Sequence, residues 1–318
     1  MNAEHLNVMS EASRLFASAS FTVGRIGVPL FLLLSGYLLL DRWYDEDGCR
    51  RFWKRNWCGL VLTTEIWIVL YDIFLWSVYD AHPSLWKHML FLQQVSMGHM
   101  WYMPMIIGLY LFLPFMARAL RNIDVKILRF PLGILSIYLF AVPVFQVIRK
   151  ALGHGWAGSL LDPGYSGGVY GVYLILGYCL KKGMLKRLTD FQVVDAGIVF
   201  FLATYFLQVF SYTHGETYNV WYNCGFLLLC AMFLFEWFSR TKIFGESHWL
   251  SWLSRYSFGL YLIHFPLIKL GAGWLKTIPL LMPLKVIFLF AGVSILSVAL
   301  CYVIGKSPKW GRWLLYNR

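Results

Sequence analysis

The stretch 24–42, GRIGVPLFLLLSGYLLLDR, combines a membrane-length apolar run with groups that lipid does not accept readily. A transmembrane helix needs about 20 mostly apolar residues, and this stretch supplies them. It also carries Arg25 near one end, Pro29, and the triplet Ser35-Gly36-Tyr37 within the run. Polar groups inside a span usually face other helices or a cavity. The stretch is therefore predicted to be a membrane helix with one face turned to the protein interior.

The rest of the chain repeats this apolar pattern. Of 318 residues, 59% are hydrophobic and only 14% are charged, whereas soluble domains carry about 25% charged residues. A transmembrane barrel would need roughly ten-residue alternating strands instead. The pattern predicts an all-α, polytopic transmembrane helical bundle with about nine spanning helices. The apolar runs are 22–40, 57–79, 100–117, 130–148, 166–180, 191–211, 219–238, 256–272 and 284–304.

A single membrane-embedded domain over residues 1–318 is expected, because the chain has no internal repeat, low-complexity tract or soluble segment. The polar stretch 1–21 is predicted to be an N-terminal tail. It lacks the basic start and apolar core of a cleavable signal. The helical bundle is expected over 22–304, and a basic tail over 305–318.

Basic residues collect in alternate connecting segments. Lys and Arg are concentrated on the cytoplasmic side of membrane proteins, so these segments are predicted to be cytoplasmic. We expect a multi-pass protein of the inner or plasma membrane with a cytoplasmic C-terminus and, after nine crossings, an outside N-terminus. The net charge of +12 follows from this topology, and no nucleic-acid partner is predicted. The basic segments are 41–56, 118–129, 181–187, 240–255 and 306–318.

The charged side chains inside predicted spans include Arg25, Glu65 and Asp72. Arg25 could snorkel to the interface or line a cavity. Glu65 and Asp72 are seven residues apart and share one helix face, so they could pair with Arg25 or line a polar cavity. Ser35 and Tyr37 could hydrogen-bond a substrate, although Ser is equally expected where helices pack closely.

Two histidines stand apart from the others. His264 falls in the middle of a span, and imidazole suits proton transfer near neutral pH; a neutral His bonded between helices is the alternative. His99 precedes Trp101 and Tyr102 at a predicted outer interface, where aromatic belts are common. Five further histidines are expected in loops without a role. No metal site is expected, because the six cysteines contain no CxxC pair. The predicted loop histidines are His82, His88, His154, His214 and His248.

A basic cluster lies in the segment DRWYDEDGCRRFWKRN. It is a topology signal that touches anionic lipid, or it is a cytoplasmic phosphate site, because guanidinium groups bind phosphate bidentately. No Walker loop, GxSxG elbow or HExxH motif occurs in the chain. The basic residues of the cluster are Arg50, Arg51, Lys54 and Arg55.

In this order the motifs resemble the integral-membrane acyltransferase family 3, which transfers acyl groups to bacterial surface glycans. The pattern R-x-x-VPLF-x-x-x-SGY at 25–37 resembles the second transmembrane helix of the family. His99-Met100-Trp101-Tyr102, followed by LYLFLPFM, resembles its HLWF-type helix start. SFGLYLIHFPL at 257–267, with Ser257, Tyr261, His264 and Pro266, resembles its penultimate helix.

The resemblance implies ten helices with both termini in the cytoplasm, so the usual first helix is expected to be missing from this chain. That helix normally carries an Arg and the His regarded as the catalytic base. His5 is the only upstream histidine and falls roughly where the family's His would lie. A start recorded too late and a lost base are both open interpretations.

The resemblance also implies the chemistry. An acyl group, expected to be acetyl, would pass from acyl-CoA to a hydroxyl of a cell-surface polysaccharide or lipid-linked glycan. Acyl-CoA is then a donor substrate held by the basic cluster, with no permanently bound cofactor, and the bilayer is a further partner. A His would accept the hydroxyl proton, and Arg25 or another buried donor would stabilise the oxyanion. The implied catalytic residues are Arg25, His264, His99 and His5, and the implied cavity residues are Ser35, Tyr37, Glu65, Asp72, Trp101, Tyr102 and Tyr261.

Two other interpretations remain open. Charged groups within spans also suit a transporter or flippase of a glycan or small polar solute, although transporters often show inverted repeats, and none is visible here. The missing helix alternatively suggests a noncatalytic relic of the family.

Overall fold

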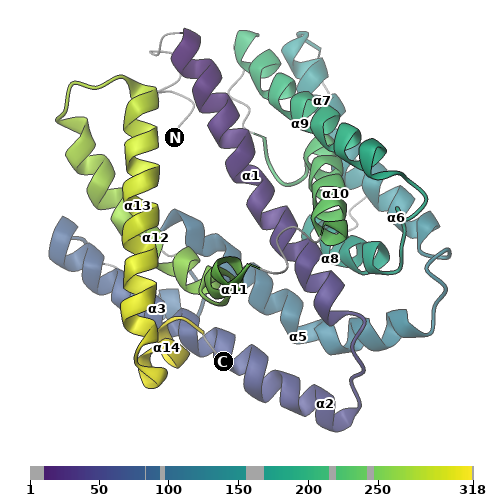
Figure 1. The fold of residues 1–318 in the computed structure, drawn as a ribbon, viewed down its shortest axis with the longest axis horizontal. Helices are drawn as coiled ribbons and strands as arrows, with labels where there is room; N and C mark the ends of the chain where they lie inside the picture. The colour runs from purple at the N-terminus through teal and green to yellow at the C-terminus, as the bar shows by residue number, and fades with distance from the viewer. Residues whose placement is uncertain are drawn as a thin grey trace. The chain divides into compact units, whose positions relative to one another are not determined.

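The computed structural model describes residues 11–82, 84–93, 97–154, 168–214, 220–241 and 247–316. Throughout these ranges the chain forms α-helices, with short π- and 3-10 segments and no strand (Figure 1). The predicted all-α class is confirmed.

Seven helical stretches within the described ranges are long and apolar enough to cross a membrane. They correspond to seven of the nine predicted runs. The other two runs form shorter helices, α8 (Gly168–Lys181) and α10 (Gly225–Arg240). Much of each shorter helix is buried in protein, so its apolar composition serves packing. The seven long stretches are Glu11–Leu39, Glu46–Tyr79, Gly98–Arg121, Arg129–Ala151, Asp190–Thr213, Ser257–Lys276 and Met282–Gly305.

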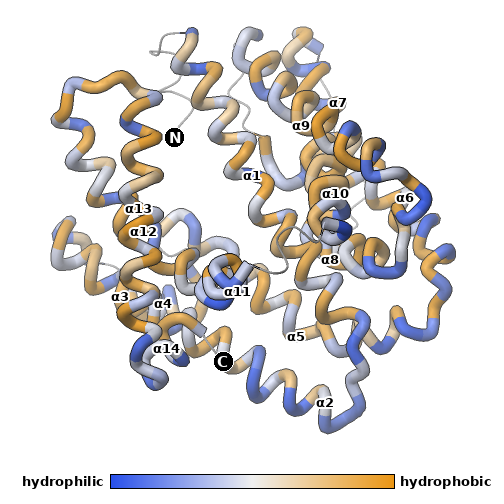
Figure 2. Tube along the Cα trace, in the orientation of Figure 1, coloured by the Kyte–Doolittle hydropathy of each residue, from blue (hydrophilic) through white to orange (hydrophobic). Residues whose placement is uncertain are grey.

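The long helices expose apolar side chains, as expected for helices surrounded by lipid. In α13 (Met282–Gly305), Phe290 is 74% exposed and Ile295 is 69% exposed. Figure 2 shows hydrophobic residues along most of α13, whereas the short α2 (Glu46–Arg51) is polar. Apolar surface of this extent is unfavourable in water. The described helices therefore support a multi-pass membrane protein.

The helices group into two units. Unit 1 combines residues 1–43 with 115–242, and unit 2 combines residues 44–114 with 243–318. The boundary falls inside α5 (Tyr102–Arg121) at Pro114. Proline removes one helical hydrogen bond, so the chain passes between the units at a weak point of this helix.

In unit 1, the backbones of α1 (Glu11–Leu39) and α8 are in direct contact where the two helices cross. A Cβ added to Gly36 would lie 1.8 Å from the carbonyl oxygen of Leu174, and one added to Gly177 would lie 2.0 Å from that of Leu33. Only glycine fits at either position, as in close helix crossings within membranes. The Gly of the Ser-Gly-Tyr triplet is thus explained by backbone packing.

The remaining helices of unit 1 follow in order. α6 (Arg129–Ser136), the π-segment η4 (Ile137–Ala141) and α7 (Val142–Ala151) form one continuous stretch. α9 (Asp190–Thr213) starts at a capping box built by Thr189 and Gln192 and packs against α10. Reciprocal side-chain bonds of this kind satisfy the free N–H groups at a helix start.

In unit 2, α2, the π-segment η2 (Phe52–Trp57) and α3 (Cys58–Tyr79) form one stretch, followed by α4 (Leu85–Met89), the 3-10 turn η3 (Gly98–Trp101) and the first part of α5. Two indoles fasten η2 to α5. Nε1 of Trp53 donates to the carbonyl of Leu111, and Nε1 of Trp57 donates to that of Ile107, each at 2.9 Å. These bonds hold the basic cluster on a fixed surface.

The C-terminal part of unit 2 contains α11 (His248–Arg255), α12 (Ser257–Lys276), α13 and α14 (Pro308–Leu314). α12 and α13 lie side by side (Figure 1). Nε1 of Trp67 in α3 donates to the carbonyl of Leu314 at 2.8 Å, and Tyr316 Oη donates to the carbonyl of Asn56 at 2.8 Å. These bonds bring α14 against the start of α3.

Candidate active site

Two histidines predicted from the sequence meet in unit 2. η3 carries His99 and α12 carries His264, and their ring centroids are 5.2 Å apart. Phe265 stacks on His99 with centroids 4.5 Å apart and an interplanar angle of 23°. Tyr261 contacts His99 edge-on at 5.1 Å. One turn of α12 therefore presents three side chains to one histidine of η3.

Hydrogen bonds fix His99 in place. Tyr261 Oη donates to the His99 carbonyl oxygen at 2.5 Å. Tyr71 of α3 donates its hydroxyl proton to the carbonyl of Leu262. The Tyr71 oxygen lies 3.2 Å from Nε2 of His99 and can accept its proton, because the phenol proton is already used. This assignment leaves Nδ1 of His99 as the unprotonated nitrogen, and Nδ1 is buried without a partner.

His264 has the opposite tautomer. Its Nδ1 lies 3.1 Å from the carbonyl oxygen of Leu260, and a carbonyl only accepts, so Nδ1 carries the proton. The lone pair of a neutral His264 is therefore on Nε2, for which the described residues provide no hydrogen-bond partner. His264 is only partly buried, in contrast to the completely buried His88.

The described part of the chain places no carboxylate in an ion pair with either ring. A neighbouring carboxylate would stabilise an imidazolium, and the described residues supply none in an ion pair with these rings. A neutral imidazole with an open nitrogen is suited to accept a proton from a substrate hydroxyl. The pair has the chemistry of a general base.

The predicted aromatic residues continue outward from this pair. Tyr102 contacts Tyr261 with centroids 5.8 Å apart, and Trp101 contacts Tyr102 at 6.0 Å. The structure thus brings His99, Trp101 and Tyr102 of one predicted motif next to Tyr261 and His264 of another. We refer to these five residues, together with Tyr71 and Phe265, as the histidine cluster.

Arg25 lies in unit 1 and is surrounded by aromatic rings. Its guanidinium carbon is 4.4 Å from the ring centroid of Phe21, 4.3 Å from that of Trp221 and 5.4 Å from that of Tyr222. Nη1 donates to Tyr222 Oη at 3.2 Å, and Nε is buried without a partner. Aromatic faces attract a guanidinium without neutralising it. Arg25 therefore keeps a buried donor, Nε, that no described residue accepts from.

The suggested pairing of Arg25 with Asp72 is wrong. The carboxylate of Asp72 instead accepts from Nδ1 of His88, at 2.9 and 3.0 Å to its two oxygens. Asp72 is 6% exposed and His88 is completely buried. The prediction of His88 as a loop residue without a role is also wrong, because it lies in α4. A carboxylate buried in apolar surroundings needs a hydrogen-bonded partner, and the fold supplies His88.

The other predicted cavity residues have these surroundings. Glu65 of α3 has one buried carboxyl oxygen, Oε2, without a hydrogen-bond partner. Ser35 donates to the carbonyl of Phe31 at 2.9 Å within α1. Tyr37 packs edge-on against Phe235 in unit 1 at 5.5 Å. Ser35 and Tyr37 are therefore engaged in contacts of unit 1, and Glu65 keeps a buried acceptor.

The four predicted phosphate-binding residues line one pocket of about 500 Å³ in unit 2. α14 adds Arg312 and Trp313 to the lining. Arg312 was missed because it is far away in the sequence, and only the bonds of α14 to the start of α3 bring it near. The spacing of the C-terminal basic residues gives no sign of this. The basic residues of the pocket are Arg50, Arg51, Lys54, Arg55 and Arg312.

Comparison with protein families defines the class of this protein. A family model described as an acyltransferase domain, that of acyltransferase family 3, matches residues 4–306. The match covers nearly the whole chain, so the protein belongs to this family and is a membrane acyltransferase. Comparison with curated proteins and with solved structures gives no match. His5, the remaining predicted catalytic residue, lies outside the described residues.

Proposed function

We propose that this acyltransferase moves an acetyl group from acetyl-CoA to a hydroxyl of a cell-surface polysaccharide or lipid-linked glycan. One observation supports the proposal above all others: His264 and His99 meet without a carboxylate, and Nε2 of His264 is open. Acyl transfer to a hydroxyl needs such a base, because the alcohol must lose a proton as it attacks.

With His264 as the base, each bond that forms in the reaction is matched by one that breaks. The acceptor hydroxyl gives its proton to Nε2 of His264 while its oxygen bonds to the thioester carbonyl carbon. The tetrahedral intermediate then breaks the carbon–sulfur bond, and the proton passes to the leaving CoA thiolate. His99 and Tyr261 hold the base in its orientation. The roles predicted for Arg25 as oxyanion donor and for His5 as an alternative base stay predictions.

The basic pocket of unit 2 supports acyl-CoA as the donor. Guanidinium groups form paired hydrogen bonds with phosphate oxygens, and Trp313 offers a flat surface to a nucleobase. The pocket volume of about 500 Å³ lies within the usual range for small-molecule sites. The donor acts as a substrate, with no cofactor bound permanently.

A donor site for acyl-CoA also implies an orientation of the protein in the membrane. The segments 41–56 and 306–318, which form the basic pocket, are both predicted to be cytoplasmic from their Lys and Arg content. Acyl-CoA is a cytoplasmic metabolite in this scheme. We therefore propose an inner or plasma membrane protein with its C-terminus in the cytoplasm.

Membranes that contain the protein, labelled acetyl-CoA and a surface-glycan acceptor test the reaction. Label is expected to move to the glycan in the wild-type sample and to be lost with His264→Gln. Separate His5→Gln membranes distinguish the two candidate bases. Transfer that survives His264→Gln unchanged, or the absence of any transfer, would overturn the proposal.

The donor site has its own test. Arg312→Gln is expected to raise KM for acetyl-CoA about tenfold with little change in kcat, because one charge-assisted phosphate contact is worth about 1.5–3 kcal/mol. Arg118→Gln, an exposed residue outside the pocket, is the matched control. If Arg312→Gln and Arg118→Gln had the same KM for acetyl-CoA, the basic pocket would not be the donor site.

A further inference from the structure

A second cavity, in unit 1, is larger than the basic pocket of unit 2. Its volume is about 1170 Å³, and its walls come from α6, η4, α7, α8, α10 and the turns before α6 and after α8. None of its lining residues belongs to the sites described above. It therefore needs its own explanation.

One end of this cavity is strongly basic. Asp124 is the only acidic residue in the lining, and its carboxylate accepts the backbone N–H of Lys126 at 3.0 Å. Lys182 forms an ion pair with Asp41 at 2.5 Å. The other basic residues have no ion pair among the described residues. The basic lining residues are Lys126, Arg129, Lys182, Lys186 and Arg187.

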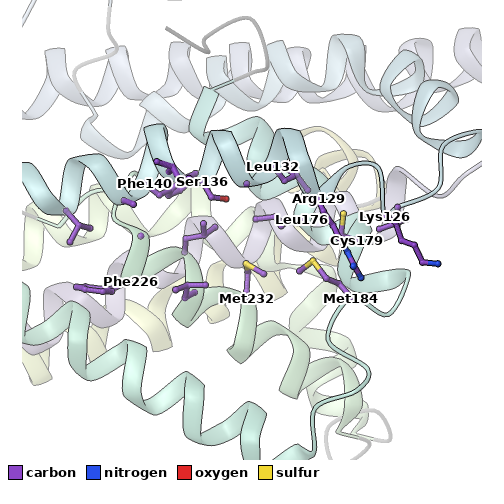
Figure 3. A pocket seen from close by; sticks show the side chains of 18 of the residues that line it. Lys126, Arg129, Leu132, Ser136, Phe140, Leu176, Cys179, Met184, Phe226 and Met232 are labelled. Carbon is purple, nitrogen blue, oxygen red and sulfur yellow. The ribbon is translucent and has the colours of Figure 1, made fainter. Parts of the chain in front are cut away.

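The other end is apolar. Figure 3 places Lys126 and Arg129 at the end near Met184, and Phe226 and Phe140 toward the opposite end. The lining is mainly hydrophobic between them. Its apolar residues include Leu132, Phe140, Val144, Leu176, Phe226 and Met232.

A π-segment forms part of the cavity wall. η4 inserts its wider turn between α6 and α7, and Ile137, Phe140 and Ala141 of this segment line the cavity. On the other wall, Gly225 at the start of α10 approaches the Phe140 carbonyl, which would lie 3.3 Å from an added Cβ. π-turns inside α-helices are rare and occur frequently at functional sites.

We propose that this cavity binds an anionic membrane phospholipid. The basic end would hold the phosphate headgroup, and one acyl chain would lie along the apolar wall toward Phe226. Basic pockets between membrane helices recognise acidic lipid headgroups in this way. The exposed apolar surface of α6 and α7 supports access from the lipid side, with Phe130 78% exposed and Phe145 50% exposed. The proposal does not depend on acyl transfer.

Lipid binding by the purified protein tests this proposal without any acyl donor. Native mass spectrometry would compare dioleoyl phosphatidylglycerol, dioleoyl phosphatidylcholine and inorganic phosphate. Phosphatidylglycerol is expected to bind at least about tenfold more tightly than phosphatidylcholine, and millimolar phosphate is expected not to displace it. Equal binding of the two lipids would overturn the role of the basic end. Displacement by phosphate alone would overturn the role of the apolar wall.

Variants locate the site. Lys126→Gln/Arg129→Gln removes two exposed charges from the basic end and is expected to weaken phosphatidylglycerol binding about tenfold or more. Arg118→Gln/Lys150→Gln removes two exposed charges of unit 1 outside the cavity and is expected to leave binding within about twofold. Similar losses in both double variants would show that binding is a general surface effect and would overturn the site.

A third variant tests the apolar end. Ala141→Phe fills part of the cavity from η4, where Ala141 is exposed. This variant is expected to weaken the binding of both lipids by a similar factor, because the new side chain blocks the path of the acyl chain and leaves the basic residues in place. Unchanged binding would overturn the proposed path of the acyl chain. Helical content measured by circular dichroism confirms that each variant is folded before its binding is compared.

Discussion

Tyr71 and Asp72 are neighbours on α3, and each holds a histidine in a different way. Asp72 binds His88 through a carboxylate, and both side chains are buried. Tyr71 contacts His99 through a phenol, and His99 in turn contacts the more accessible His264. One residue along a helix turns the side chain by about 100°. That turn separates a buried structural pair from a pair with an open nitrogen that can accept a proton.

The largest expected effect separates the two histidine pairs by activity. His264→Gln is expected to lower kcat for acyl transfer about 10²- to 10⁴-fold, the usual contribution of a general base. His88→Gln is expected to change kcat per folded molecule less than about threefold. Both are measured by label transfer in membranes. If His88→Gln lost activity as fully as His264→Gln, the division into a structural pair and a catalytic pair would fail.

The second effect separates the pairs by stability. Asp72→Ala leaves the buried Nδ1 of His88 without its hydrogen-bond partner, and a buried polar group left unsatisfied typically costs about 1–3 kcal/mol. A marked fall in the thermal unfolding temperature in detergent is expected. Asp72→Leu/His88→Leu, which removes both polar groups, is expected to recover much of this loss. A double variant as unstable as Asp72→Ala would show that the pair does not act as a unit.

A third, smaller effect concerns Tyr71 as a positioning residue. Tyr71→Phe removes the hydroxyl that bonds the Leu262 carbonyl and faces Nε2 of His99. One such bond contributes about 0.5–1.5 kcal/mol. A decrease in kcat of about tenfold or less, with KM nearly unchanged, is expected from steady-state kinetics. A change confined to KM would mean that Tyr71 acts on substrate binding instead.

The smallest expected effect on stability comes from the ion pair of Asp41 and Lys182, which lies at the surface, in contrast to the buried Asp72–His88 pair. The hydrogen bond from Lys182 lowers the pKa of Asp41 below its ordinary 3.8. A lowered pKa stabilises the folded state above the unfolded-state pKa, and this stabilisation is lost as pH falls through the folded-state value. Asp41→Asn is expected to cost at most about 1 kcal/mol at neutral pH.

The measurement for Asp41 is thermal unfolding of wild type and Asp41→Asn at several pH values. The difference between them is expected to be constant above about pH 5 and to shrink below pH 3.8. A difference that grows as the solution becomes more acidic would contradict the assigned direction.

The fold class could be predicted from composition alone, because apolar runs of spanning length leave few alternatives in a bilayer. The lengths of α8 and α10 could not be predicted so well. An apolar residue packed against protein and one facing lipid look the same in a sequence. The buried glycines of the α1–α8 crossing carry that information, and their meaning depends on a partner helix more than a hundred residues away.

The candidate site was predictable where its residues occur in motifs. His99, Tyr261 and His264 were selected from such motifs, and the fold brings them together. The Asp72–His88 pair was not predictable, because it depends on how α4 folds back on α3. Arg312 was missed for the same reason. Contacts of this kind are properties of tertiary structure and leave no local pattern.

The aromatic surroundings of Arg25 have a consequence for biosynthesis. Tyr222, which accepts the hydrogen bond of Arg25, is 197 residues further along the chain. At about 5–20 residues per second, the ribosome needs about 10 to 40 s to make that interval. During this time, of the three rings around it, only Phe21 is present. Until then the first described helix carries a guanidinium that lacks two of its three aromatic neighbours and its hydrogen-bond acceptor, so unit 1 can close around Arg25 only late in synthesis.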